Sequence, residues 1–488
     1  MQRPVDLFDR AAEWAALSRF VSDDRPGATL GVVSGRRRQG KTFLLDAACR
    51  ATGGFFFGAT QATDAESLRR LGAQLTEQLG APVPVRLDGW EEALDALLAL
   101  GRERALPVVI DEFPYLAEAA PSLPSVIQNA LRPGRPEATE SRTRLVLCGS
   151  AMSFMGRLLG GNAPLRGRAG LELVVHPFDH RVAAQFWGIT DPRLAVLVNA
   201  VVGGTPAYRR EFVRDDVPHD LADFDDWVVR TVLDPTTPLF REARYLLAEE
   251  PGARNPALYH SVLAAVAGGN ATRGGIANYV GRKATDISHP LTVLTDSGLL
   301  RQEADPFRSN RTSFRIAEPL VAFYHAIMRP VWDQLERPGA AARVWRAARS
   351  RFDSNILGPH FEHLCRTWAL TGDDLPFDGL PASVASGVVN DPSARTTHEV
   401  DVAVVGAADP GAPAPLLAVG EAKWNTVMNP GHLDRLRRVR TLLATSAYDT
   451  SRTMLLCFSG AGFSDDLVAQ ATSTPGEIAL ISLEAIYR

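Results

Sequence analysis

The sequence predicts a multidomain α/β protein with two separate strand-containing domains and a helical region between them. Three observations support this prediction. A chain of 488 residues exceeds what one hydrophobic core usually serves. A glycine-rich string, Gly35–Thr42, stands between two apolar runs in the first part of the chain. A second group of strand-like runs appears near the other end, around Asp401 and Glu421.

Composition places the chain among soluble globular proteins. Hydrophobic residues make up 45% and charged residues 22%, and the net charge of −4 gives no overall nucleic-acid signature. There is no apolar run of 18 residues and no charged-then-apolar leader, so we expect neither a membrane span nor secretion. Cys49, Cys148, Cys365 and Cys457 lie far apart without metal-ligand spacing. They are interpreted as buried thiols in a reducing compartment, which predicts a cytoplasmic protein.

The glycine-rich string matches the full GxxxxGK[ST] phosphate-binding pattern. An apolar run, Leu30–Val33, predicts a strand before it, and the residues after it predict a helix. Gly35 and Gly40 permit a backbone whose N–H groups wrap around phosphates. Lys41 then reaches the β- and γ-phosphates, and Thr42 holds Mg²⁺. The sequence therefore predicts a site for ATP or GTP.

An apolar run that ends in two acids is the expected partner of a phosphate loop. Leu106–Ile110 is such a run, and Asp111 and Glu112 follow it. Asp111 would hold Mg²⁺ through water, and Glu112 would polarise the attacking water. Many strands end in acids, but the position about 70 residues after the phosphate loop favours the catalytic interpretation.

Two further segments of this first part carry candidate nucleotide contacts. A predicted strand, Arg144–Cys148, ends at Gly149 and Ser150. Ser150 is either a sensor of the γ-phosphate or part of a simple turn. Arg166 and Arg168 precede a fifth predicted strand and are candidates to stabilise transition-state charge, in cis or across a subunit interface. The alternative for both arginines is a solvated surface position.

The order of these motifs resembles the archaeal-type ATPases, a STAND-like branch of the AAA+ superfamily. The resemblance covers roughly residues 5–330. It implies an AAA+-type ATPase core with a helical lid, ATP and Mg²⁺ as cofactors, and a position for Pro206 at the adenine pocket. The alternative for the Gly-Gly-Thr-Pro segment is a helix-breaking turn. The motifs that carry the resemblance are Asp9-Arg10-x-x-Glu13, the phosphate loop, Ile110–Tyr115, Cys148–Met152, Pro164–Arg168 and Gly203–Pro206.

The middle of the chain predicts helices and then a winged helix. Residues 180–250 are predicted helical, with a proline-rich break at 234–238. Helices at 258–267, 272–280 and 284–297, followed by a hairpin over 301–316, predict a winged helix. Its third helix has few basic residues and is interrupted by Pro290, which disfavours DNA reading and favours a lid or assembly module.

The segment after the winged helix is the best candidate for a DNA-phosphate contact. Residues 301–351 contain ten arginines and five acids, a net charge of +5. Arg343, Arg346 and Arg349 fall at helical spacing near Trp345. The alternative is a solvated helix face.

A second catalytic constellation is predicted near the C-terminus. Asp401 lies in a strand-like run, Glu421 and Lys423 end the next one, and Glu362 lies on a preceding helix. Residues two apart on a strand face one side, so Glu421 and Lys423 share a site that Asp401 can join. Two carboxylates bind Mg²⁺, Glu362 adds a third acid, and the lysine orients or deprotonates a water. Glu399 could share the role of Asp401.

These residues resemble the PD-(D/E)xK restriction-endonuclease-like nucleases. Asp401 matches the family aspartate, Glu421-Ala-Lys423 its ExK, and Glu362 the acid of its first helix. The combination with an upstream ATPase is typical of archaeal-type ATPases. The alternative is a surface ion pair, and residues 351–488 carry ten basic residues and sixteen acids, a net charge of −6 that does not suit a DNA groove. Four arginines between 435 and 440 would supply positive charge or form a solvated face.

Together these observations divide the chain into five predicted parts. The leading hypothesis is an ATPase that controls a Mg²⁺-dependent DNA endonuclease, with DNA and a second copy of the chain as partners. The resemblance alone implies that it acts on, or in defence against, mobile DNA. The alternative is a STAND-like, nucleotide-switched scaffold with an inactive C-terminal domain. Arg36–Arg38 are interpreted as solvent-facing charge or as an interface to what the nucleotide controls. The parts are an ATPase core (1–178), a helical lid (179–255), a winged helix (256–330), a basic connector (331–351) and a nuclease-like domain (352–488).

Overall fold

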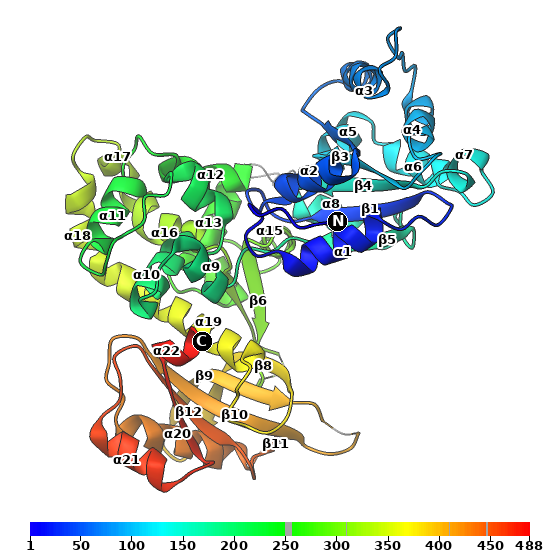
Figure 1. Cartoon of the computed structure of the whole chain (residues 1–488). Coiled ribbons are helices and arrows are strands. Elements are labelled where there is room, and N and C mark those ends of the chain that lie inside the picture. Colours follow the sequence, from blue (N-terminus) through cyan, green and yellow to red (C-terminus); the bar gives the residue numbers. More distant parts are fainter. Residues whose placement is uncertain (249–255, 309, 409, 446–447) are drawn as a thin grey trace.

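The computed structural model describes residues 1–248, 256–308, 310–408, 410–445 and 448–488. The chain forms an N-terminal α/β unit, a central helical body and a C-terminal α/β unit, and the helical body lies between the other two (Figure 1). Among the described residues, no helix combines the length and apolar character needed to cross a membrane. The four cysteines are buried free thiols, as predicted.

The N-terminal unit is a parallel sheet with helices on both faces. The strand order is β2-β3-β4-β1-β5, and every pairing in it is parallel. Its elements are α1 (Ala11–Val21), β1 (Thr29–Ser34), α2 (Lys41–Thr52), β2 (Phe55–Gly58), α3 (Asp64–Leu79), α4 (Trp90–Ala99), β3 (Leu106–Asp111), α5 (Phe113–Ala119), α6 (Leu123–Ala130), α7 (Pro136–Thr139), β4 (Thr143–Gly149), α8 (Met152–Leu159) and β5 (Ala169–Val174).

The topology of this sheet positions the predicted phosphate site. Strands β3 and β4 are buried along their whole length, which their continuous apolar runs require. The carboxyl ends of β1, β3 and β4 lie at one edge, where the phosphate loop, Asp111 and Ser150 follow them. A parallel sheet with a phosphate loop between its first strand and helix is consistent with a P-loop AAA+ fold, as the sequence predicted.

The helical body contains the predicted lid, winged helix and connector. Its elements before the hairpin are α9 (His180–Trp187), α10 (Pro192–Val202), η1 (Tyr208–Phe212), α11 (Phe224–Thr231), α12 (Pro238–Ala248), α13 (Pro256–Ala267), α14 (Arg273–Val280) and α15 (Ser288–Asp296). Those from the hairpin onward are β6 (Leu300–Ala304), β7 (Thr312–Ile316), α16 (Pro319–Phe323), η2 (Tyr324–Met328), η3 (Arg329–Val331), α17 (Trp332–Leu335), α18 (Ala341–Phe352) and η4 (Asp353–Leu357).

Three helices and a hairpin follow one another in the predicted winged-helix order. The prediction for the third helix, 284–297, was wrong at its start, because α15 begins at Ser288. Pro290 lacks an N–H and is tolerated only in the first turn of a helix, so the helix begins just before it rather than being interrupted by it. The strands β6 and β7 pair antiparallel, from Leu300 opposite Ile316 to Ala304 opposite Thr312.

The C-terminal unit is a mixed sheet between helices. The strand order is β13-β12-β10-β9-β8, with β11 paired to β10; β9 is antiparallel to β8 and β10, whereas β12 and β13 continue parallel to β10. Its elements are α19 (Gly358–Thr371), β8 (Pro381–Asp391), β9 (Thr396–Gly406), β10 (Ala414–Lys423), α20 (Pro430–Leu443), β11 (Tyr448–Asp449), β12 (Met454–Ser459), α21 (Asp465–Ser473), β13 (Ile478–Ser482) and α22 (Leu483–Ile486).

One hydrophobic core joins the helical body to the C-terminal sheet. A continuous buried cluster runs from Trp227 and Phe352 in the body, through Phe361 of α19, to Val402 and Leu456 in the sheet. The sheet of the N-terminal unit has separate clusters on its two faces. The predicted connector, residues 331–351, is therefore not an independent linker, because α18 packs its apolar face into the shared core.

Candidate functional site

The phosphate loop connects β1 to α2 by a backbone that requires glycine. Gly35 has φ 154°, and a Cβ there would lie 2.5 Å from the carbonyl oxygen of Val175. Gly40 has φ 88°, a left-handed value that side chains rarely adopt. The two glycines therefore occupy the positions at which the motif needs them.

Two predicted magnesium ligands meet at the edge of the sheet. The Thr42 hydroxyl donates to Asp111 Oδ2 at 2.7 Å. Asp111 is buried at the end of β3, whereas Thr42 is exposed at the start of α2. Lys41 is buried beside them, and its Nζ donates to the carbonyl oxygen of Arg36 at 2.9 Å. Burial lowers the pKa of Lys41, and the nearby acids oppose this shift.

Glu112 and Ser150 form a second polar group at the same edge. The Ser150 hydroxyl lies 3.0 Å from both carboxylate oxygens of Glu112. Arg37 Nε donates to Ser150 Oγ at 3.2 Å, and its NH2 donates to the Tyr115 hydroxyl at 2.7 Å. Glu112 has φ 51°, and its own N–H donates to Asp111 Oδ1 at 3.0 Å. Ser150, predicted as a sensor or a turn residue, thus contacts the predicted catalytic acid directly.

A cavity of about 650 Å³ lies against the phosphate loop. It is lined by loop residues 37–42, by Glu112 and, on the opposite side, by Phe178 and Pro206. Pro206 was predicted to lie at the nucleotide, and it lies in this wall. The size suits a nucleotide, since small-molecule sites typically occupy about 300–1,000 Å³.

Gly204 fixes the lid turn next to this cavity. A Cβ on Gly204 would lie 1.9 Å from the carbonyl oxygen of Phe178, and the N–H of Phe178 donates to the Gly204 carbonyl at 2.9 Å. Thr205 follows, and its hydroxyl accepts from Gln39 Nε2 of the phosphate loop at 3.1 Å. The turn is therefore bonded to the loop and does more than end a helix.

Arg10 is a contact that sequence reasoning missed. The sequence assigned Arg10 no contact, but it is buried at the residue before α1. Its NH2 donates to the carbonyl oxygen of Gln39 at 3.2 Å, and its guanidinium lies 4.5 Å from the Phe178 ring centre. The only signal was its place in the Asp-Arg-x-x-Glu string that opens the predicted motif order.

The three arginines of the phosphate loop bind other parts of the chain. Arg36 NH1 donates to Glu318 Oε2 at 2.7 Å, and Arg38 pairs with Glu242. Both acids are buried in the helical body. The interpretation as solvent-facing charge was therefore wrong, and the alternative of an interface agrees with the structure. Long-range partners of this kind leave no local sequence signal.

Arg166 and Arg168 do not lie at the cavity. Arg166 is exposed and donates to the carbonyl oxygen of Gly161 at 2.7 Å, and Arg168 is half-buried. Neither is among the described residues that line the nucleotide-sized cavity. A role for either in trans stays a prediction, as does a second copy of the chain as partner.

At the C-terminal unit, the sheet brings three predicted residues together. Gly420 pairs with Val402 across β9 and β10, which sets Asp401 beside Glu421. The N–H of Ala422 donates to Asp401 Oδ2 at 2.9 Å, and Lys423 Nζ lies 2.9 Å from Glu421 Oε1. Burial, with Glu362 and Glu421 nearby, raises the pKa of Asp401.

The carboxylates of this group also have cationic partners. Arg435 of α20 lies 3.3 Å from Glu421 Oε1. Glu362 of α19 lies 3.7 Å from Arg315 of β7 and 3.8 Å from Arg366. In the described part of the chain, no three His, Cys, Asp or Glu side chains are placed to share one metal ion. The predicted three-acid set of Glu362, Asp401 and Glu421 is thus not assembled as such. Glu399 is exposed.

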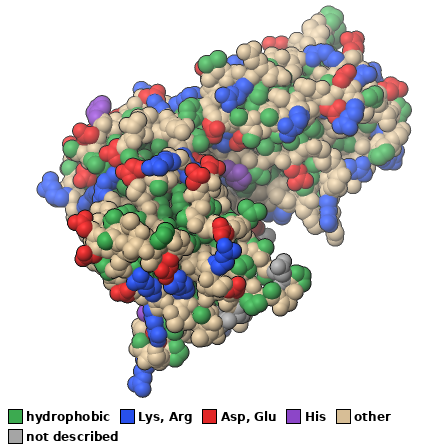
Figure 2. Space-filling view, turned by 60° about the horizontal axis from the view of Figure 1, so that its bottom comes forward, with side chains coloured by type: hydrophobic (Ala, Val, Ile, Leu, Met, Phe, Trp, Pro, Cys, Tyr) green, Lys and Arg blue, Asp and Glu red, His purple; other side chains and the backbone are tan. Residues whose placement is uncertain are grey.

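The predicted DNA-contact arginines differ in environment. Arg343 and Arg346 of α18 are exposed, whereas Arg349 pairs with Asp225 at 3.2 Å and packs against the Trp345 ring. Basic and acidic side chains are interspersed on the face shown in Figure 2 and form no continuous band there. The four arginines of α20 each pair with an acid: Arg435 with Glu421, Arg437 with Asp434, Arg438 with Asp391 and Arg440 with Glu477.

Comparison with known proteins does not identify a family for this chain. No protein-family model matches the chain. It is 24% identical over 332 residues to the uncharacterized protein MJECL04 of Methanocaldococcus jannaschii, a match covering 67% of this chain and 70% of that protein.

Two solved structures show partial similarity. The Walker-type ATPase PABY2304 of Pyrococcus abyssi is 20% identical with a TM-score of 0.47, covering 66% of this chain and 97% of that one. The ORC2 protein of Aeropyrum pernix, solved as ADPNP–ADP complexes, is 18% identical with a TM-score of 0.39, covering 72% of this chain and 97% of that one.

Proposed function

We propose that the chain binds and hydrolyses ATP at the cavity beside the phosphate loop, and that the nucleotide controls a DNA phosphodiesterase in the C-terminal unit. The ATPase proposal rests on the convergence of Lys41, Thr42, Asp111 and Glu112 at one edge of the sheet. A buried cation, a hydroxyl–carboxylate pair and a second carboxylate there are what phosphoryl transfer to water requires.

Each group has a definite task in this proposal. Lys41 places its positive charge on the β- and γ-phosphates. Glu112 accepts a hydrogen bond from the attacking water, and Ser150 keeps its carboxylate in place. Thr42 and Asp111 would hold Mg²⁺, since their oxygens meet at 2.7 Å and hard cations prefer oxygen ligands. When bound, the ion would neutralise developing charge on the phosphates.

The use of lysine in this chain supports both sites. The chain has 52 lysines and arginines, but only Lys41, Lys283 and Lys423 are lysines. One stands in the phosphate loop and one beside Asp401 and Glu421. Lysine is a compact point charge that can lose its proton, whereas arginine is a planar fork that stays charged. Two of the three lysines in this arginine-rich chain therefore stand at places where this difference affects chemistry, and the third, Lys283, is an exposed residue.

At the second site, the residues suit phosphodiester cleavage. Asp401 and Glu421 would hold Mg²⁺: burial, with Glu362 and Glu421 nearby, raises the pKa of Asp401, and a cation would stabilise its charged form. The ion would polarise the phosphodiester when bound. Lys423 would orient a water molecule or stabilise charge on the phosphate. Arg343 and Arg346, both exposed, are the proposed contacts to the DNA backbone.

A specific observation favours a second candidate function. Glu421 already contacts two cations, Lys423 and Arg435, and Glu362 contacts Arg315 and Arg366. Acids neutralised in this way are typical of a structural network. The alternative is therefore a nucleotide-switched scaffold in which the C-terminal unit binds a partner without cleaving it.

Lysine-to-arginine variants test both activities while preserving charge. We expect Lys41→Arg to abolish phosphate release from ATP, and Lys423→Arg to abolish Mg²⁺-dependent nicking of supercoiled DNA while ATP hydrolysis continues. Lys283→Arg, at an exposed lysine, is the matched control and should retain both activities. DNA nicking that persists in Lys423→Arg, or that is absent from the unmodified chain with ATP and Mg²⁺, would favour the scaffold.

A further inference from the structure

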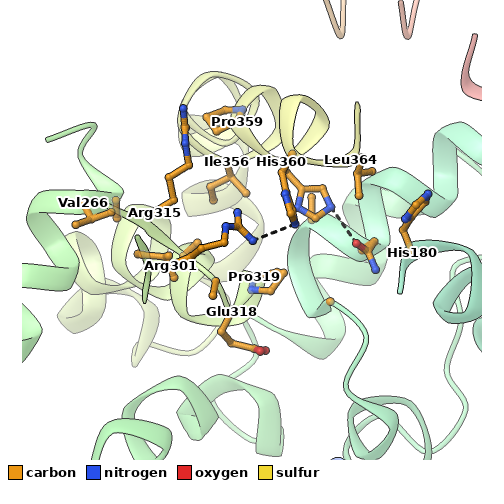
Figure 3. Close-up of a pocket in the computed structure, with 18 of the residues that line it drawn as sticks. His180, Val266, Arg301, Arg315, Glu318, Pro319, Ile356, Pro359, His360 and Leu364 are labelled. Atoms are coloured by element: carbon orange, nitrogen blue, oxygen red, sulfur yellow. Dashed lines mark hydrogen bonds between the residues drawn. The ribbon is translucent and has the colours of Figure 1, made fainter. Parts of the chain in front are cut away.

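A second cavity, of about 740 Å³, lies where the helical body meets the C-terminal unit. Its walls come from the turn into α9, the end of α10, the end of α13 with the turn after it, and the β6–β7 hairpin with the turn into α16. The segment η4 and the first turns of α19 complete them (Figure 3). It is as large as the cavity at the phosphate loop, so it has room for a molecule of nucleotide size.

Most of the surface of this junction cavity is apolar. Val266, Phe314, Pro319, Ile356 and Leu364 are among its lining residues. Apolar walls that carry a few placed polar groups are the usual composition of a small-molecule site. A ligand with a ring or a short aliphatic part would be held by these walls.

Positive charge in the junction cavity comes from Arg301 and Arg315. Arg301 Nε lies 2.8 Å from Glu303 Oε1, and Arg315 Nε lies 3.3 Å from the other oxygen of the same carboxylate. Arg315 also lies 3.7 Å from Glu362 at the edge of the C-terminal site. Arg301 NH1 lies 3.1 Å from His363 Nε2.

The acids in the cavity wall are engaged elsewhere. The Asp179 carboxylate caps α9 by accepting from the N–H groups of Arg181 and Val182, both at 2.9 Å. The Glu318 side chain points away from Arg301 and pairs with Arg36 of the phosphate loop (Figure 3). Neither carboxylate therefore opposes an anion placed beside Arg301. Glu303 does lie beside Arg301, but this acid and Glu362 face three guanidinium groups, those of Arg301, Arg315 and Arg366.

Histidines supply neutral polar groups to the same cavity. Four of the ten histidines in the chain line it: His176, His180, His360 and His363. Burial lowers the pKa of His360 to about 3 and lowers that of His363. These two imidazoles are thus neutral, and His360 bonds to Asn199 Oδ1 at 2.9 Å. They add hydrogen-bonding groups to the cavity but no charge, so its positive charge comes from the arginines alone.

We propose that the junction cavity binds an organic anion of nucleotide size. Its phosphate or carboxylate group pairs with Arg301, and its ring or aliphatic part packs against the apolar walls. The guanidinium of Arg301 shares the Glu303 carboxylate with Arg315. An N–H of such a guanidinium that is not bonded to the carboxylate is a strong donor to an anion. The histidine side chains complete the polar contacts.

The junction cavity is also coupled to the phosphate loop. Glu318 belongs to its wall and bonds to Arg36 at 2.7 Å, and the carbonyl oxygen of Arg36 accepts from Lys41 Nζ at 2.9 Å. A ligand that moves this wall also moves the phosphate loop. By linkage, a nucleotide bound at the loop then changes the affinity of the cavity for its anion. This coupling rests on the proposed nucleotide site, whereas the anion site itself does not.

Calorimetric titration of the full chain tests the anion site. The phosphate loop is first saturated with ADP and Mg²⁺, and AMP or inorganic phosphate is then added as the probe. We expect AMP to bind, and to bind more tightly than phosphate because of the apolar walls. Arg301→Gln should weaken AMP binding at least about tenfold, the effect of losing one charge-assisted hydrogen bond. Arg311→Gln, on the same hairpin and outside the cavity, is the matched control.

A variant that fills the junction cavity tests the site without changing its charge. Ala322 lines the cavity, and Ala322→Phe should abolish AMP binding while thermal unfolding verifies that the chain is folded. Absence of AMP binding to the unmodified chain at millimolar concentration, or unchanged binding in both Arg301→Gln and Ala322→Phe, would overturn the site. Equal affinity for AMP and phosphate would refute the proposal that the apolar walls hold an organic part of the ligand.

The coupling has its own measurement. In Glu318→Gln, AMP should still bind, but the effect of AMP on ADP affinity should disappear. Lys41→Ala should lose ADP binding and retain AMP binding, which separates failure of the nucleotide site from failure of the junction cavity. An AMP effect on ADP affinity that is unchanged in Glu318→Gln would refute the route through Arg36.

Discussion

Glu112 adopts a backbone conformation that a residue with a side chain rarely takes. Its φ is 51°, in the left-handed region, which costs roughly 1–2 kcal/mol for a residue other than glycine. Such conformations persist where the surrounding structure holds them, and they concentrate at functional sites. Here the conformation lets the Glu112 N–H bond to Asp111 while the carboxylate lies against Ser150. The sequence indicated the residue from its position after β3, but no pattern indicated its conformation.

We predict that Glu112→Gln stops ATP hydrolysis without preventing ATP binding. The amide keeps the shape and the contact to Ser150 but cannot take a proton from water, so the rate of phosphate release should fall about 100-fold or more. ATP affinity, measured by calorimetry, should change little. The matched control is Glu118→Gln, an exposed glutamate on the next helix, α5. Normal turnover in Glu112→Gln would show that another group positions the water.

The pair between Arg36 and Glu318 joins two units that are distant in sequence. The side chains are 13% and 3% exposed, so the charges are largely removed from water. Breaking a largely buried ion pair by removing one partner costs about 3–5 kcal/mol. The sequence could not predict this contact, because 282 residues separate its members.

We therefore predict that Glu318→Ala lowers the free energy of unfolding by about 3 kcal/mol, measured by urea denaturation. Glu336→Ala is the control, because Glu336 and its partner Arg241 are 45% and 42% exposed and 3.6 Å apart. Pairs of that kind contribute about 0–1 kcal/mol. Equal losses for the two variants would mean that Glu318 does not hold Arg36 in solution.

At the scale of elements, the lid turn after α10 is where the helical body touches the nucleotide cavity. Gly204 tolerates no side chain, Thr205 bonds to Gln39 of the phosphate loop, and Pro206 lines the cavity. The resemblance noted in the sequence implied a place for this turn beside the nucleotide, and that role stays a prediction. The physical reason, a close approach of Gly204 to the Phe178 backbone, is visible only in three dimensions.

We predict that Gly204→Ala lowers both the melting temperature and ATP affinity. The added methyl carbon would lie 1.9 Å from a backbone oxygen, so the turn must move and take Pro206 with it. Gly156→Ala is the matched control, since it lies within α8 with open space around its Cβ. Alanine favours a helix over glycine by about 1 kcal/mol, so this control should be neutral or stabilising. Unchanged ATP affinity in Gly204→Ala would show that the turn does not contribute to ATP binding.

Elements with a strong hydrophobic periodicity or a long apolar run were predicted from the sequence. Strands that depend on pairing with a distant segment were not. The buried strands of the first sheet matched their apolar runs, as did β9 and β10, which carry Asp401 and Glu421. The prediction missed β8, Pro381–Asp391. This strand is shaped by its antiparallel register with β9, a non-local contact. Local sequence patterns carry no information on such contacts, so they also could not predict the cations beside Glu362 and Glu421.

At the scale of the whole molecule, the units are less separate than the sequence suggested. Composition changes predicted five parts, but the buried cluster that begins in the helical body continues into the C-terminal sheet. The residue pattern shows that a helix has an apolar face, as α19 does, but not which element covers that face. In the structure α19 packs on β8, β9 and β10 and contributes to both units.

This distribution of cores predicts two unfolding transitions in calorimetry rather than five. The N-terminal sheet has its own clusters, so it should melt separately from the helical body and C-terminal sheet, which share one core and should melt together. ADP with Mg²⁺ at about 100 times its dissociation constant should stabilise the nucleotide-binding transition by about 2.7 kcal/mol. In Lys41→Ala that shift should vanish while the second transition stays in place. A single transition that shifts as a whole would instead mean that Arg36–Glu318 and Arg38–Glu242 unite the two cores into one cooperative unit, and Glu318→Ala should then divide it into two.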